Sequence, residues 1–243
     1  MGCHLRRKEQ GVTWTGVIES TRGAASLRSL LAGRYADPTL TELEHEALRW
    51  LDGFYQLEHL LAARAWVKRL LPEASEALRF AALVHDAERF FPGGPDSRPK
   101  DGFDNPDYLF AHSLRSADIV GAWLDGRVPP AFARRVRSLI LRHEIGGDVE
   151  EDVLQASDSL AWLSAFDWLA IDWVRAGHYT IEGAREKLDW MMARMRPPHA
   201  IRLGLPMYAD TIRALYAAHE TTSDIPLRRK LAGDRALLLG ETA

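Results

Sequence analysis

Apolar residues recur every three or four positions between residues 43 and 71, which is the spacing of an amphipathic helix. Thr41 and Glu44 have the spacing of a capping box, which predicts a helix start, and Pro72 predicts an end. This segment therefore predicts one long amphipathic helix or two shorter ones. The apolar stripe consists of Leu43, Ala47, Leu51, Phe54, Leu57, Leu61 and Ala65.

Helical periodicity continues along the rest of the chain, and strand signals are nearly absent. Residues 92–107 predict a loop rich in Gly, Pro and Asp, long enough to favour a functional role. The pattern as a whole predicts an all-α fold, a compact helical bundle. The further predicted helices cover residues 73–91, 108–126, 131–147, 150–177, 180–195 and 206–220.

The changes in pattern along the chain predict three parts. Residues 1–36 are expected to be an irregular N-terminal segment, in which weak alternation over 12–21 favours a short strand or a tail. Residues 37–220 are expected to form one helical domain, because no internal repeat or linker divides them. Residues 221–243 are expected to be a tail or a short helix.

Composition narrows the class of protein. Of 243 residues, 47% are hydrophobic and 27% charged, which is ordinary for a soluble globular protein with a sizeable core. The net charge of −3 gives no support for binding to nucleic acid. The single cysteine, Cys3, excludes an internal disulfide. No apolar run is long enough for a membrane helix, and the basic start lacks the apolar stretch of a signal peptide. We therefore expect a cytoplasmic protein without a membrane partner.

The first candidate functional residues are His85 and Asp86, which directly follow the apolar run 80–84. Similar polar residues lie beside apolar stripes in other predicted helices, so their side chains are expected to face the interior. Buried carboxylates without partners cost several kcal/mol. A divalent transition metal removes that cost, because imidazole and carboxylate groups are its usual ligands. The predicted metal ligands are His59, His85, Asp86, His112, His143 and Asp158.

The order of these six residues resembles the HD-domain superfamily, in which His, His-Asp, His, His and Asp lie on successive helices. The segment "LVHDAERF" is similar to the family's His-Asp segment. The segment "LRHEIGGDVEEDVLQASDSLAWL" is similar to its last ligand segments, with Ser157 where the family usually has alanine. The resemblance covers roughly His59 to Trp173 and implies a compact bundle of helices around a metal site.

The resemblance also implies roles for the ligands. One metal ion would be held by His59, His85, Asp86 and Asp158. His112 and His143 resemble the subset that holds two metals, with Asp86 as the bridge. Alternatively, these two histidines line a one-metal pocket and bind substrate. The implied cofactor is one or two divalent transition metal ions: iron, manganese, zinc, cobalt or nickel.

Three functions follow from the resemblance. The first is a metal-dependent phosphohydrolase that uses metal-activated water on a small phosphorylated molecule such as a nucleotide. The second is a di-iron oxygenase that cleaves a C–C or C–P bond with dioxygen, because a minority of the six-ligand subset has this chemistry. The third is a regulatory module without turnover, against which the intact ligand set argues.

Cations near the ligands are candidates for binding the substrate. Arg89 lies four residues after His85, and we expect it, with Asp86, to be catalytic and to bind phosphate; a surface ion pair with Glu88 or Asp86 is the alternative. Arg115 and Lys68 are candidate anion contacts, although a solvated helix face is the favoured interpretation for both.

Weaker candidates complete the set. Glu88 is expected to orient a ligand or a water. Arg64, Arg98 and Lys100 are further possible anion contacts, and Arg194 with Arg196 loosely resembles a late basic motif of the family. The tryptophans, among them Trp162, Trp168 and Trp173, are expected in the core, with stacking on a base as a minor alternative. The histidines expected to be surface or structural residues are His4, His45, His178, His199 and His219.

Overall fold

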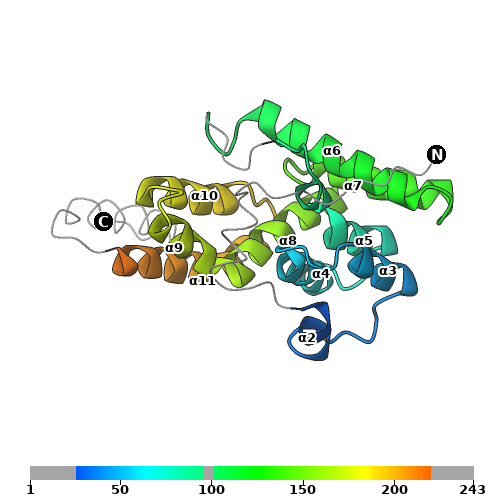
Figure 1. Cartoon of the computed structure of the whole chain (residues 1–243), viewed down its shortest axis with the longest axis horizontal. Coiled ribbons are helices and arrows are strands. Elements are labelled where there is room, and N and C mark those ends of the chain that lie inside the picture. Colours follow the sequence, from blue (N-terminus) through cyan, green and yellow to red (C-terminus); the bar gives the residue numbers. More distant parts are fainter. Residues whose placement is uncertain (1–25, 96–100, 220–243) are drawn as a thin grey trace.

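The computed structural model describes residues 26–95 and 101–219, and within these ranges it contains helices and no strand (Figure 1). The predicted all-α fold class is thereby confirmed. The helices are α2 (Leu27–Ala32), α3 (Glu42–Trp50), α4 (Leu57–Leu70), α5 (Glu76–Val84), the 3₁₀ helix η1 (Ala87–Phe90), α6 (Pro106–Leu124), α7 (Pro130–Arg142), α8 (Val149–Ala165), α9 (Asp167–Arg175), α10 (Ile181–Ala193) and α11 (Pro198–Ala218).

The predicted capping box at the start of α3 is present, since Thr41 and Glu44 bond to each other's backbone N–H groups. The apolar stripe over 43–71 belongs to two helices, α3 and α4. A turn separates them, and Gly53 within it has φ 84°, a conformation that glycine adopts without strain. Ala65, which we placed on the apolar stripe, is exposed.

Several predicted helix boundaries are wrong. The helix expected over 73–91 is divided into α5 and η1, and the helix expected over 131–147 ends at Arg142. The helix expected over 150–177 is divided into α8 and α9 at Phe166, whose backbone is not helical. The helix expected to start at residue 206 starts at Pro198 and continues through Pro206. Proline at the first helical position is favourable, because its missing N–H group would have no partner there.

Helices α4 and α8 contact each other more extensively than any other two described helices, and they form a central pair. In Figure 1, α6 and α7 lie together along one side of this pair, and α9, α10 and α11 form the opposite end of the molecule. The central pair packs against α5, and α8 also packs against α7, while α6 packs against α7 and η1. The predicted metal ligands lie on these helices or directly after them.

The buried apolar cluster extends from Leu30 to Tyr216. Residues 26–36 were expected to be irregular, but they contain α2, and its Leu30 belongs to this cluster. The short strand or tail expected at 12–21 and the tail or short helix expected at 221–243 lie outside the described residues.

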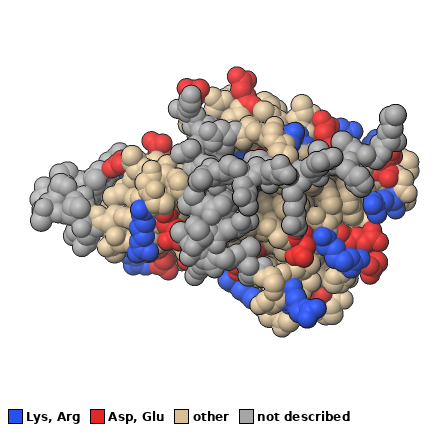
Figure 2. Space-filling view, viewed as in Figure 1, with Lys and Arg blue, Asp and Glu red and all other residues tan. Residues whose placement is uncertain are grey.

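The described surface in Figure 2 carries basic and acidic side chains interspersed, without a large area of one sign. Among the residues that the structure describes, no helix combines the length and the apolar character needed to cross a membrane.

Candidate metal centre

The His85-Asp86 pair occupies a break between two helices. Helix α5 ends at Val84 and η1 begins at Ala87, so these two residues lie in the connection. The backbone carbonyl of His85 accepts a hydrogen bond from the buried Ser116 hydroxyl of α6, which satisfies a group that a helix end leaves without a partner. The break therefore fixes His85 and Asp86 at the point where α4, α6 and α8 converge.

A first group of metal-capable side chains consists of His59, His85 and Asp158, all buried. They come from α4, from the end of α5 and from α8. The Oδ1 atom of Asp158 lies 3.0 Å from His59 Nε2 and 3.4 Å from His85 Nε2. One carboxylate oxygen thus faces two imidazole nitrogens. We call these residues the first triad.

A second triad consists of Asp86, His112 and His143. The Oδ1 atom of Asp86 lies 2.9 Å from His112 Nε2 and 3.8 Å from His143 Nε2. The same oxygen lies 3.9 Å from His85 Nε2 of the first triad. Asp86 therefore belongs to the second triad and also approaches a histidine of the first. The structure brings all six predicted ligands together.

The rings of His85 and His143 are oriented by hydrogen bonds on their outer nitrogens. The Nδ1 atoms of His85 and His143 lie 3.0 Å and 2.6 Å from the carbonyl oxygens of Ala82 and Ile140. Because a carbonyl oxygen can only accept, each Nδ1 must carry a proton, so the inward Nε2 is the nitrogen that a metal ion would bind. Both Nε2 atoms are buried and have no hydrogen-bond partner among the described residues.

His112 is oriented in the same way by Glu88 of η1. Its Nδ1 atom lies 2.8 Å from Glu88 Oε1, and both side chains are only 1% exposed. A carboxylate behind an imidazole is the usual support of a metal-binding histidine. Buried Nε2 atoms without partners, facing carboxylate oxygens, are the donor set that a divalent transition metal requires, so the residues present fit the predicted cofactor.

The charges of the cluster compensate one another. Burial alone would lower the pKa of His85, but Asp86 and Asp158 outweigh burial and raise it to about 9. Burial lowers the pKa of His143 to about 4, and the neighbouring His112 and His85 act in the same direction. Burial would raise the pKa of Asp86, but His85, His112 and Arg89 hold it well below its usual range.

Sequence reasoning gave no ligand role to Glu144, which the structure adds to the cluster. It follows His143 directly, is buried, and forms a third metal-capable group with His143 and Asp158. Its Oε1 atom lies 3.7 Å from His143 Nε2. The sequence signal was its position beside a predicted ligand. Arg194, which loosely resembled a late motif of the family, also contacts the cluster. Its guanidinium donates hydrogen bonds to Glu144 and Asp158.

A cleft opens onto the cluster. Its polar wall includes Asp86, His112, Glu144 and Asp158, together with the cations Arg89 and Lys187. Its apolar wall includes Trp162, Phe166, Leu169, Trp173 and Met191. Sequence reasoning missed Lys187, because it lies on α10, outside the segment that carries the ligands. Burial lowers the pKa of Lys187 to about 8, against the opposing effect of Glu144.

Arg89 is the predicted cation that reaches the cleft. Its Nη2 atom donates to the Tyr108 hydroxyl, and its Nη1 atom lies 3.6 Å from Glu88 Oε1. Arg89 therefore does pair with Glu88. The pair lies beside the cleft, so it is not the surface ion pair that was the alternative expectation.

The other predicted cations lie elsewhere. Lys68 and Arg64 both contact Asp37, and Arg64 also pairs with Glu44, so neither lines the cleft. Arg115 donates to the Pro92 carbonyl and lies 3.5 Å from Glu88, behind His112. Arg196 is exposed and pairs with Asp152. Arg98 and Lys100 lie outside the described residues.

The remaining histidines and tryptophans have varied environments. His45, His178 and His219 are half-buried and His199 is exposed, while His4 lies outside the described part of the chain. Trp162 is buried, as expected for a core residue. Trp168 and Trp173 are half-buried, and Trp173 lines the cleft together with Trp162.

Comparison of the chain with protein-family models, with curated proteins and with solved structures gives no match. The fold and the side chains described above are therefore the basis for any statement about function. What they define is an all-α protein with a buried cluster of imidazoles and carboxylates that could hold metal ions.

Proposed function

We propose that the protein is a metal-dependent phosphohydrolase of the HD superfamily that acts on a small phosphorylated molecule such as a nucleotide. The observation that supports this most is the arrangement of the six predicted ligands. They form two adjoining triads, with Asp86 of the second approaching His85 of the first, beside a cleft that Arg89 and Lys187 line. Metal ions and fixed cations together are the means by which proteins stabilise charge during phosphoryl transfer.

Each triad of side chains would hold one ion of the cofactor. The first triad, His59, His85 and Asp158, would hold one divalent ion, and the second triad would hold another. When bound, such ions neutralise phosphate charge and lower the pKa of a coordinated water. The inward Nε2 atoms, fixed by bonds on Nδ1, would keep the donor geometry without rearrangement.

Arg89 would bind the phosphoryl group of the substrate. Its guanidinium is held by Tyr108 and Glu88, so it loses little freedom when an anion arrives. Lys187 approaches the same cleft from α10 and would contact a second phosphate oxygen. The apolar wall, which includes Trp162 and Phe166, would contact the organic part of the substrate and exclude water from it.

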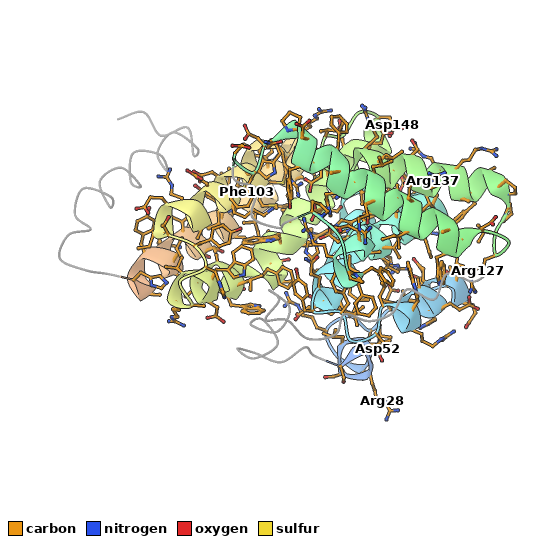
Figure 3. The ribbon with its side chains drawn as sticks, turned by 45° about the horizontal axis from the view of Figure 1, so that its top comes forward. Arg28, Asp52, Phe103, Arg127, Arg137 and Asp148 are labelled. Carbon is orange, nitrogen blue, oxygen red and sulfur yellow. The ribbon has the colours of Figure 1, made fainter. Side chains whose placement is uncertain are left out.

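Phe103, labelled in Figure 3, lies shortly before α6. Its ring stacks on Tyr179 at 6.0 Å, and the Lys187 Nζ atom lies 5.1 Å from the centre of the same ring. The end of the predicted functional loop thus reaches Lys187, which supports the expectation that this loop contributes to the substrate site.

A di-iron oxygenase is the second candidate. It rests on the full set of six predicted ligands, because four buried imidazoles with two carboxylates can hold two irons as well as two other transition metal ions. The two candidates share every ligand and differ in the chemistry that the ions perform.

The test is a phosphate-release screen over nucleotides and small phosphomonoesters, with protein loaded in turn with manganese, cobalt, zinc, nickel or iron. Release by the wild type, its loss in Asp86→Ala and its strong reduction in Arg89→Gln would support the hydrolase. Arg137→Gln is the matched control, because Arg137 is exposed and pairs with Asp118 far from the cleft. Oxygen uptake by the iron-loaded protein, without phosphate release, would favour the second candidate instead.

A further inference from the structure

Arg194 is a buried arginine whose guanidinium lies among the carboxylates of the cluster. It directly follows α10, and its side chain is 1% exposed. Its Nε atom donates to the Ser159 hydroxyl at 2.8 Å, its Nη1 atom donates to Glu144, and its Nη2 atom donates to Asp158. Bonds on all three nitrogens fix the guanidinium in one orientation.

The two carboxylates accept these bonds on their outer oxygens. Arg194 contacts Oε2 of Glu144 and Oδ2 of Asp158. The other oxygen of each carboxylate faces the histidines, since Asp158 Oδ1 lies 3.0 Å from His59 Nε2 and Glu144 Oε1 lies 3.7 Å from His143 Nε2. The guanidinium therefore determines which oxygen each carboxylate presents to the cluster.

The two carboxylates, although close together, face different triads. Asp158 belongs to the first triad, whereas Glu144 Oε1 lies within 4 Å of the Nε2 atoms of His112 and His143 in the second triad. We propose that Arg194 is a positioning residue that holds Asp158 and Glu144 together and so supports metal binding at both triads. This inference rests on the proposed metal centre.

A positioning role can be separated from a purely electrostatic one by the sign of the effect. A positive charge next to a cation site repels the cation, so removal of Arg194 would strengthen metal binding if only Coulomb forces mattered. If Arg194 holds the ligands in place, its removal releases two carboxylates and weakens metal binding, because loss of a group behind a ligand typically costs about 10- to 100-fold in affinity.

The experiment titrates metal-free protein with Co²⁺ alone and follows the visible absorption of the bound ion. Arg194→Gln should bind both Co²⁺ ions about 10- to 100-fold more weakly than the wild type. Arg194→Lys keeps the charge but cannot reach both carboxylates in the same way, so it should be intermediate. Arg196→Gln is the matched control, because Arg196 lies two residues away, exposed and paired with Asp152, and it should match the wild type.

Equal or tighter Co²⁺ binding by Arg194→Gln would overturn the inference, and weakening of only one ion would overturn the claim that Arg194 serves both triads. If Arg194→Gln does not fold, a folded Arg194→Lys protein with wild-type affinity would overturn it equally. Absence of Co²⁺ binding by the wild type would overturn the proposed metal centre and this inference with it. Equal affinities in the wild type and the variants would overturn the inference alone.

Discussion

Glu88 offers a selective perturbation of the candidate centre, because it contacts one ligand histidine only. Its Oε1 atom lies 2.8 Å from His112 Nδ1, and its side chain is 1% exposed. The turn after η1 covers it closely, since a Cβ atom added at Gly94 would collide with the Glu88 carboxylate. Glu88→Gln keeps the shape and an acceptor oxygen, whereas Glu88→Ala removes both the charge and the hydrogen bond.

The size of the effect follows from this contact. Loss of the group behind a metal-binding histidine costs about 10- to 100-fold in metal affinity, and each factor of ten corresponds to about 1.4 kcal/mol. We expect Glu88→Gln near the lower limit and Glu88→Ala near the upper limit. Only the ion at the second triad should weaken, because His112 belongs to that triad and the first triad has no contact with Glu88.

The assay is competition for metal between the protein and a chelator of known affinity, with the two binding steps fitted separately. Glu73→Gln is the control, because Glu73 is exposed in the turn before α5. Thermal unfolding of each metal-free variant shows whether the fold survives. Unchanged affinity for both ions in Glu88→Ala, or equal weakening of both, would refute this reasoning.

Three other predictions concern binding, pH and stability. Asp86→Ala should lose metal and activity while far-ultraviolet circular dichroism shows that the helices persist; metal retained at full stoichiometry would contradict the bridging role. The raised pKa of His85 stabilises the metal-free fold fully below pH 6.5, and this contribution is lost as the pH rises through about 9. Because a metal ion must displace that proton, metal affinity measured by calorimetry should rise up to about tenfold per unit between pH 7 and 9, and a flat profile would exclude His85 as a ligand. Arg64→Met should cost about 3–5 kcal/mol in chemical unfolding, because the buried Glu44 loses its cationic partner and keeps only its bond from the Thr41 backbone, with metal content unchanged.

The sequence pattern predicted the helices and the six ligand candidates because both depend on local signals. Helical spacing marks the buried stripes, and a histidine or carboxylate beside such a stripe must face the interior. No glycine or proline marks the division at Phe166, so the sequence predicted a helix over 150–177 without a break. The start of α11 was missed because proline was taken as a boundary at residue 206 instead of at residue 198.

The cations were predicted less well, because their roles depend on direction around a helix and on contacts between distant segments. Arg64 and Lys68 follow His59 by five and nine residues, which at 3.6 residues per turn places them about 140° and 180° around the helix from it. They therefore point away from the cluster, toward Asp37. Lys187 and Arg194 reach the cleft and the cluster from α10 and its end, which no spacing within residues 59–173 can predict.

The metal content of each chain tests the proposed metal centre itself. It is measured by elemental analysis of protein purified without chelator and without added metal. We expect one or two transition metal ions per chain, with loss of metal in Asp86→Ala. Manganese, cobalt, nickel or zinc would support the hydrolase, whereas two irons would shift the case to the oxygenase. A wild-type chain that holds no metal, even after reloading, would contradict the proposed centre.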